Sequence, residues 1–478
     1  MRRYLPLILF VIVLVAPLVL SRAVSGRRDS APAARGDALD LVIITPHQEG
    51  IRREFADAFS QWHREHFGRP VNIDYRWFGA SDVVKFFEAS RDTVFKTQGT
   101  YHVDLAWGGG DYLFDNDRQL KPYLAPVQLD PSLLRAAFPD PLLGGLPLYD
   151  LSKGHPPLWY GTALSSFGIV YNKDAVRYLR PPEPKTWKDL ADPRYGNWIV
   201  LADPTRSASA KTAYMVIVER AMADAAEQGR SEDEGWADGM GLIRLISANT
   251  RIFVDSSSTV PIMVSTGDAA AGTAIDFYGR SQADAVGDER VGYVEPENAT
   301  VINPDPIGLI QGAEHREVAV RFMEFVLSEQ GQKLWITRAG APGGPRQTSL
   351  RRLPIRPDVY RDMTNFSDKV NPFEAAGKFN KSAAREKTFS ILGELMQFSC
   401  MDLLDELRET RKTILASPRA AELDAKLGRF PFGQKEALRR QDQWKAATAA
   451  QKLALQRQWT KEFSDEYAGL RREALRPR

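Results

Sequence analysis

Cysteine is nearly absent from this chain, because Cys400 is the only one among its 478 residues. A single thiol excludes an intrachain disulfide and a metal site made of several cysteines. An excess of one charge is also lacking: the chain has 63 lysines and arginines and 61 aspartates and glutamates, which leaves a net charge of +2. This balance, with no dominant basic cluster, argues against a nucleic-acid partner.

Enzyme signatures are missing as well. The chain contains no GxSxG nucleophile elbow, no P-loop, no GxGxxG motif after a strand pattern and no HExxH motif. We therefore expect no catalytic residues and no cofactor. Because catalytic residues can lie far apart in a sequence, an extracytoplasmic hydrolase is retained as the third of three functional hypotheses.

Long hydrophobic runs are lacking except at the N-terminus. There the basic MRR precedes an uninterrupted apolar run at residues 4–20, and Ser21 and Ala23 follow at the spacing of a signal-peptidase site. A run of this length fits both a signal-peptide core and a short membrane span. Residues 1–23 are therefore predicted to be a cleaved signal peptide or a retained signal anchor, and residues 24–38 a polar linker. The rest of the chain is expected to be periplasmic or otherwise extracytoplasmic, held at the membrane only if the N-terminal segment is uncleaved.

Strand and helix patterns alternate over most of the remaining sequence. LDLVIIT at residues 39–45 is typical of a buried strand, and Ile51, Phe55 and Phe59 then recur at helical spacing. The strand patterns VNIDYRW and VDLAW follow, with a helix pattern between them. Such an alternation with short connections predicts an α/β fold with a parallel sheet covered by helices. From about residue 385 the sequence is helix-forming, rich in charge and without strand patterns.

Three consecutive glycines, residues 108–110, stand directly after VDLAW. Glycine has no Cβ, so its backbone N–H groups can approach a ligand closely. Ligands of parallel sheets bind at the carboxyl ends of the strands. The glycine run is therefore predicted to line a ligand cleft, and the alternative is a tight turn that contacts no ligand.

Four stretches between about residue 40 and 340 read, in order, IITPHQEGIRREFADAFSQW, ADPTRSASAKTAYMV, VSTGDAAAGTAIDFYG, and NPDPIGLI followed by VAVRFMEFVLSEQGQKLW. Together they resemble the substrate-binding proteins of ABC importers, above all the ferric-ion-binding group and relatives that bind phosphonates, sugar phosphates or thiamine. The resemblance implies a type 2 periplasmic-binding-protein fold, with two lobes joined by hinge-crossing strands. We expect lobe 1 at residues 39–170 and 301–390, lobe 2 at residues 171–300, and a helical C-terminal extension at residues 391–478.

The resemblance also implies metal-ligand positions, and this chain departs from them. The histidine of the ferric-ion binders corresponds to His47, and their two adjacent tyrosines correspond to Phe277 and Tyr278. The place of their glutamate falls within the glycine run. Iron(III) is a hard cation that favours several anionic oxygen ligands, which His47 and Tyr278 do not supply. A ferric-iron-binding transport protein is therefore the alternative hypothesis, with these two residues as its metal ligands.

The same departures favour an anionic ligand. Phosphate and phosphonate groups bind backbone N–H groups, hydroxyls and helix N-termini. The first hypothesis is an extracytoplasmic solute-binding protein that captures a small anionic solute by hinge closure and delivers it to ABC permease subunits. A membrane-anchored ligand-sensing receptor domain is the second. The candidate ligand-binding residues are Thr45, His47, Gly108, Gly109, Ser207, Ser209, Ser257, Asp276 and Tyr278.

Overall fold

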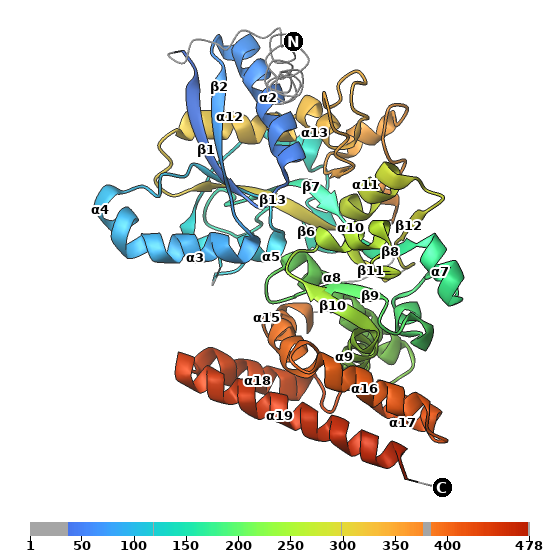
Figure 1. The fold of residues 1–478 in the computed structure, drawn as a ribbon. Helices are drawn as coiled ribbons and strands as arrows, with labels where there is room; N and C mark the ends of the chain where they lie inside the picture. The colour runs from blue at the N-terminus through green and yellow to red at the C-terminus, as the bar shows by residue number, and fades with distance from the viewer. Residues whose placement is uncertain (1–36, 118, 298, 376–383, 477–478) are drawn as a thin grey trace, which may run out of the picture.

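The computed structural model describes residues 37–117, 119–297, 299–375 and 384–476. The predicted signal peptide or anchor (1–23) and nearly all of the predicted linker (24–38) lie outside the described residues. Within the described ranges, no helix has both the length and the apolarity needed to cross a membrane. Figure 1 shows two α/β lobes, one above the other, and a layer of C-terminal helices beneath the second lobe.

Lobe 1 is built on a sheet with the strand order β14-β7-β13-β3-β1-β2, with β4 paired to β13. β1, β2 and β3 are mutually parallel, as the sequence predicts, whereas β7 and β3 both pair antiparallel to β13. The strands are β1 (Leu39–Thr45), β2 (Val71–Trp77), β3 (Leu105–Trp107), β4 (Leu124–Ala125), β7 (Tyr160–Ser165), β13 (Asn303–Ile310) and β14 (Leu353–Pro354); β5 (Leu142–Leu143) and β6 (Leu146–Pro147) form a separate hairpin.

Helices cover this sheet because each places an apolar stripe against it. In α2 (Glu49–Phe67), Phe55 and Phe59 are fully buried and contact the rings of Trp107 and Phe325. The other helices of lobe 1 are α3 (Ala80–Ser90), η2 (Arg91–Phe95), α4 (Lys96–Gln98), α5 (Asp111–Phe114), η3 (Lys121–Tyr123), α6 (Pro131–Ala137), α12 (Arg316–Leu327), α13 (Glu329–Ile336), η6 (Pro357–Arg361) and α14 (Pro372–Ala375).

Lobe 2 has a five-stranded sheet with the order β10-β9-β11-β8-β12. Its strands are β8 (Phe167–Asn172), β9 (Ile199–Ala202), β10 (Thr250–Val254), β11 (Ala271–Ile275) and β12 (Val291–Val294). Its helices are α7 (Lys173–Leu179), η4 (Trp187–Ala191), η5 (Pro193–Tyr195), α8 (Ala208–Glu227), α9 (Glu232–Ala248), α10 (Thr259–Thr266) and α11 (Asp276–Val286). The chain enters this lobe between β7 and β8 and leaves it between β12 and β13.

The C-terminal extension, meaning residues 384–476 from here on, is entirely helical in its regular elements. These are α15 (Ala384–Met396), η7 (Gln397–Met401), α16 (Leu404–Leu415), α17 (Ala420–Leu427), α18 (Gln434–Ala446) and α19 (Ala449–Ala474). The four-residue repeat of α19 is buried, with Trp459, Phe463 and Tyr467 each at most 1 % exposed. The extension packs on lobe 2, where α15 contacts α8 and where α16, α17 and α18 contact α9.

Two predicted boundaries fall inside regular elements. The border at residue 170 lies within β8, and the chain changes sheets earlier, at Ser166. The border at residue 391 lies within α15. Sequence patterns locate helices and strands better than they locate the boundaries between them, which accounts for both differences.

Candidate functional site

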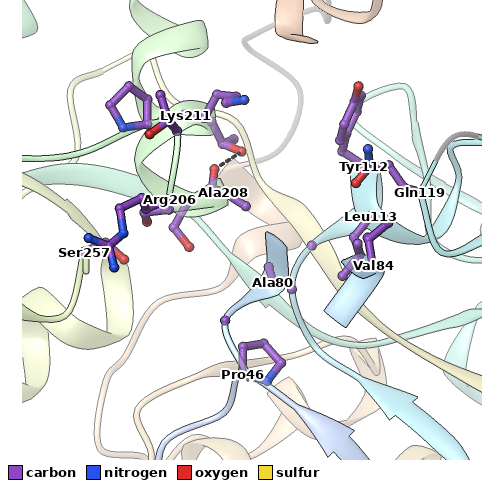
Figure 2. Close-up of a pocket in the computed structure, with 18 of the residues that line it drawn as sticks. Pro46, Ala80, Val84, Tyr112, Leu113, Gln119, Arg206, Ala208, Lys211 and Ser257 are labelled. Atoms are coloured by element: carbon purple, nitrogen blue, oxygen red, sulfur yellow. Dashed lines mark hydrogen bonds between the residues drawn. The ribbon is translucent and has the colours of Figure 1, made fainter. Parts of the chain in front are cut away.

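A cavity of about 930 Å³ lies between the two lobes and is also lined by the C-terminal extension. Figure 2 shows its opposing sides: Tyr112, Leu113 and Gln119 of lobe 1 face Arg206, Ala208 and Lys211 of lobe 2. A cleft at the junction of two lobes, with polar groups converging from both, is the usual place for a small-molecule site.

The glycine run forms part of the lobe 1 wall. Gly108, Gly109 and Gly110 have φ angles of 89°, 108° and 87°, a region that side chains rarely adopt. A Cβ on Gly108 would lie 2.7 Å from Cε1 of His47, and one on Gly109 would lie 2.8 Å from Leu113. Gly109 and Gly110 line the cavity. All three glycines therefore form a tight turn, and Gly109 and Gly110 also form part of the cleft wall.

A buried polar cluster of His47, Asp305 and Arg352 forms the floor of the cavity. Asp305 Oδ2 accepts a hydrogen bond of 2.7 Å from Arg352, and Asp305 Oδ1 accepts one of 3.0 Å from the backbone N–H of Gly110. His47 Nε2 lies 3.8 Å from Asp305 Oδ2. Asp305 lies on β13 and Arg352 directly precedes β14, so two lobe 1 strands hold the cluster in place.

The protonation states of this cluster follow from its burial. Burial lowers the pKa of His47 to about 3, because a charged imidazole would be poorly solvated there, so the ring is neutral at physiological pH. Burial alone would raise the pKa of Asp305, but Arg352, His47 and the backbone N–H of Gly110 together hold this pKa below its usual value. The cluster thus contains a carboxylate, a guanidinium and a neutral imidazole.

Two nitrogen atoms of this cluster lack a partner. Arg352, which is 1 % exposed, donates from Nη2 to Ser165 Oγ at 2.8 Å and lies over the ring of Phe277 at 4.4 Å. Arg352 Nε and His47 Nε2 are buried and have no hydrogen-bond partner among the residues that the structure describes. Buried polar groups are nearly always hydrogen-bonded, so these two atoms indicate where a bound molecule would contribute its own polar groups.

The lobe 2 wall consists of hydroxyl-bearing loops at helix starts. Ser207 is the N-cap of α8, and its side chain accepts a hydrogen bond of 3.3 Å from the backbone N–H of Ala210. One turn into α8, Thr212 donates to the carbonyl of Ala208 at 3.0 Å. Arg206 forms an exposed ion pair of 2.6 Å with Asp255. These groups face the cavity from the start of a 20-residue helix.

Six of the nine candidate residues line the cavity: His47, Gly109, Ser207, Ser209, Ser257 and Tyr278. Thr45, Gly108 and Asp276 lie outside the lining. Thr45 is fully buried and donates to the carbonyl of Trp107 at 2.6 Å, which ties β1 to β3. Gly108 donates its N–H to Pro306 at 2.7 Å. The ligand-binding roles of the six lining residues stay predictions.

Asp276 belongs to a second buried cluster at the start of α11. It is fully buried, 3.8 Å from Arg280, which also pairs with Glu295. Burial raises the pKa of Asp276 to about 7, because desolvation of the carboxylate outweighs the attraction of Arg280. This residue therefore titrates inside lobe 2 and does not face the cleft.

His47 and Tyr278, the metal ligands that the resemblance implies, both line the cavity, and their role as metal ligands stays a prediction. Burial raises the pKa of Tyr278 to about 12, so its phenol stays protonated near neutral pH. In the described part of the chain, no group of three or more His, Cys, Asp or Glu side chains is placed to hold a metal ion. At the floor the guanidinium of Arg352 is already paired with the carboxylate of Asp305, so these two charges balance.

Sequence reasoning missed several cavity residues. One signal was available, because Asp305 interrupts the otherwise apolar NPDPIGLI strand with a charge. Arg352 and Lys211 carried no signal, since single basic residues are common at surfaces. The extension was not expected to reach the cleft at all, yet Phe389, Glu394 and Trp444 line it.

Known proteins share both the sequence pattern and the fold. Residues 148–355 match the sequence model of a family described as bacterial extracellular solute-binding protein. The chain is 24 % identical over 173 residues to the phosphoglycerate transport regulatory protein PgtC of Salmonella typhimurium, covering 36 % of this chain and 39 % of that protein. It is 28 % identical over 229 residues to iron uptake protein A1 of Synechocystis sp., covering 45 % and 58 %. The chain thus spans between two fifths and three fifths of these relatives.

Solved structures agree on the architecture. The periplasmic binding protein P5PA superposes with a TM-score of 0.53 at 16 % identity, covering 74 % of this chain and 94 % of that one. The periplasmic binding protein AfuA from Actinobacillus pleuropneumoniae, solved with fructose-6-phosphate bound, gives a TM-score of 0.53 at 16 % identity, covering 77 % and 96 %. The expected two-lobed α/β fold and the resemblance to solute-binding proteins are confirmed, together with the helical C-terminal region.

Proposed function

We propose that this chain is the extracytoplasmic solute-binding component of an ABC importer and that its solute is a small organic anion, such as a phosphate ester or a phosphonate. The match of residues 148–355 to the solute-binding family supports the general role. The observation that carries the anionic part is the cavity floor, where Nε of the buried Arg352 has no hydrogen-bond partner among the described residues. A guanidinium nitrogen in that position favours an oxyanion.

The rest of the cavity is consistent with this ligand chemistry. Three lining carboxylates already have cationic partners: Asp305 pairs with Arg352, Asp255 with Arg206 and Asp82 with Lys85. Lys211, four residues into α8, forms no ion pair among the described residues and lies beside the hydroxyls of Ser207 and Ser209 on the same helix start. Helix N-termini with nearby hydroxyls and a cation are favourable for phosphate groups.

The volume of the cavity favours an organic anion over a bare ion. Small-molecule sites range from about 300 to 1,000 Å³, and this cleft holds about 930 Å³. Hinge closure would reduce that space as the lobes approach the solute. Micromolar affinity corresponds to about −8 kcal/mol, which a few charge-assisted hydrogen bonds in a closed cleft can supply. The closed form is then the state that a permease recognises.

Ferric iron is the second candidate, because one relative is named an iron uptake protein. His47 and Tyr278 both line the cavity, as that reading requires. The protonated phenol of Tyr278, the neutral imidazole of His47 and the adjacent Arg352 oppose it, since none of them supplies negative charge to a hard cation.

A receptor that senses the same solute uses the same cleft. The relative PgtC is named a transport regulatory protein, which is the observation that supports this role. The two roles differ in the partner that binds the closed form, a permease or a signalling protein. Co-purification of the solute-loaded chain with its membrane partner separates them.

A thermal-shift screen of the purified chain tests the ligand class. We expect phosphate esters or phosphonates to raise the melting temperature by mass action, whereas thiamine and ferric citrate leave it unchanged. Lys211→Gln and Arg352→Met are expected to reduce the shift, while Arg177→Met, an exposed arginine on α7, keeps it. A shift with ferric citrate alone, accompanied by an absorbance that Tyr278→Phe abolishes, would favour iron. Turnover of the esters would contradict a binding protein.

A further inference from the structure

The extension supplies one side of the cleft. Phe389, Ile391 and Glu394 from α15, and Gln441, Trp444 and Lys445 from α18, line the same cavity as the two lobes. Figure 1 shows α15 and α18 below α3 and α5, on one side of the molecule. All of these extension residues lie beyond residue 355, where the match to the solute-binding family ends.

The extension is fixed to lobe 2 by buried polar contacts. Arg244 of α9 is fully buried and donates to the carbonyls of Leu427 and Arg429, each at 2.7 Å, and to Glu466 at 2.9 Å. At Gly241 of the same helix, a Cβ would lie 2.0 Å from the carbonyl oxygen of Gly428, so the two backbones are in direct contact. These contacts attach the extension wall directly to α9 of lobe 2.

The same wall reaches across to lobe 1. Phe389, which is 3 % exposed, packs on Tyr112 with a ring-centroid distance of 4.4 Å. Tyr112 belongs to α5, the short helix that directly follows the glycine run. Phe389 also lies under the ammonium group of Lys211, 5.6 Å from its ring centroid. A residue of the extension thus stands between the lobe 1 wall and the cation at the start of α8.

The extension lines the cavity with a carboxylate, an amide and an indole, whereas the floor contains a guanidinium, a carboxylate and an imidazole. Glu394 Oε2 is a buried atom with no hydrogen-bond partner in the described residues. Its neighbour Gly393 leaves room for Lys211, whose Nζ would lie 3.3 Å from a Cβ at that position. The indole of Trp444 packs against Phe398 and Trp459, with centroid distances of 5.5 and 5.8 Å. Gln441 is fixed by a hydrogen bond of 2.5 Å from Ser390.

We propose that α15 and α18 form a subsite for the hydroxyl-bearing organic part of the solute, opposite the Arg352 floor that takes its anionic group. The inference rests on the proposed function and names its substrate class as polyhydroxylated phosphate esters. The unpartnered carboxylate oxygen of Glu394 accepts hydrogen bonds from hydroxyls, and the fixed Trp444 ring offers an apolar surface to the carbon skeleton. Lys211 lies between the two subsites and contacts the anionic end.

Titration calorimetry of the full chain with inorganic phosphate, glycerol 3-phosphate and glucose 6-phosphate tests the subsite. We expect affinity to rise along this series for the unmodified chain. Glu394→Gln and Trp444→Ala are each expected to weaken glucose 6-phosphate about tenfold, and to change inorganic phosphate by less than about twofold. Asp465→Asn is the matched control, because that carboxylate forms an exposed pair with Lys461 on α19.

The outcomes separate the subsite from the proposed function. If both variants bind glucose 6-phosphate as the unmodified chain does, or lose all three ligands equally, the subsite is overturned and the binding function stands. If the unmodified chain binds none of the three, the proposed function fails and the subsite fails with it. Glu394→Gln replaces one oxygen by nitrogen, so the test holds even if Trp444→Ala does not fold.

Discussion

On the lobe 1 side of the cleft, His47, Asp305 and Arg352 are at most 8 % exposed and are held by partners from several strands. On the lobe 2 side, the side chains of Arg206 and Asp255 are 60 % and 69 % exposed and are held mainly by each other. The first wall is preorganised, so a ligand meets groups whose conformational entropy is already lost. In the proposed function, the second wall reorders when it closes on a ligand. We infer that lobe 1 sets ligand chemistry and lobe 2 sets the energetics of closure.

The extension changes this comparison, because its helices pack on lobe 2 behind the exposed side chains of the lobe 2 wall. Arg244 attaches the extension to α9. Arg244→Met should therefore lower the free energy of unfolding by about 3 kcal/mol, since Glu466 and two carbonyls lose their hydrogen-bond donor. Urea unfolding followed by circular dichroism measures the change. Arg177→Met removes an exposed ion pair and should change stability by less than about 0.5 kcal/mol. Equal effects of the two variants would contradict an anchored extension.

The rigidity of the lobe 1 wall is tested next, at its glycine run. Gly108→Ala places a Cβ against the His47 ring at a φ of 89°, and we expect a loss of about 2–4 kcal/mol from backbone strain and collision. Gly110→Ala has nearly the same φ, 87°, but meets open space, so it should lose only about 1–2 kcal/mol. Chemical denaturation measures the stability of both variants, and the difference between them gives the cost of the contact between the added Cβ and the His47 ring. Indistinguishable losses would mean that His47 moves freely, and that the wall is not preorganised.

A pH experiment compares the buried clusters of the two lobes. Because burial raises the pKa of Asp276 to about 7, the carboxyl is neutral in the folded state at pH 5 and ionised at pH 8, while in the unfolded state it is ionised at both. The stability that it contributes is present at low pH and is lost as the pH rises through 7. The unmodified chain should therefore lose on the order of 2 kcal/mol more unfolding free energy than Asp276→Asn when the pH is raised from 5 to 8.

The contribution of His47 to stability depends on pH in the opposite direction. Burial lowers its pKa to about 3, so its contribution to stability is present above pH 6.5 and is lost as the pH falls toward 3. Thermal unfolding of the unmodified chain and of Asp276→Asn from pH 4 to pH 8 measures both trends. A constant difference between the two proteins across this range would show that Asp276 does not titrate near pH 7.

The smallest expected effect lies on the lobe 2 wall. Ser207→Ala removes the N-cap of α8 and should lower stability by about 0.5–1 kcal/mol. Ser209→Ala, on the same stretch but without a capping bond among the described residues, should leave stability nearly unchanged. Differential scanning fluorimetry without ligand measures the two variants. A loss of several kcal/mol in either variant would contradict the view that this wall is only loosely held.

Much of the fold followed from the sequence because its patterns are local. The parallel β1, β2 and β3 and the helical C-terminal region were predicted correctly. The glycine run was placed at a strand end and next to the cleft, and Gly109 does line it. Short-range periodicity and backbone chemistry carry this information, so no long-range contact was needed.

The site was predicted less completely, for a physical reason. The floor joins His47 with Asp305 and Arg352, which come together only when β13 and β14 pair with β7. Asp276 looked like a cleft residue because it neighbours Tyr278, but the turn of α11 directs the two side chains to different surroundings. No periodicity indicates which surface α15 covers, so the contribution of Phe389 and Glu394 could not be foreseen.

The backbone contact between Gly241 and Gly428 limits where this protein can be cut. A shortened gene ending at residue 355, where the family match ends, would leave that seam and the Arg244 guanidinium facing water. We infer that the folding unit is longer than the segment that matches the family model. Swapping recognition loops between this protein and those relatives is therefore best done with the entire C-terminal helical layer retained.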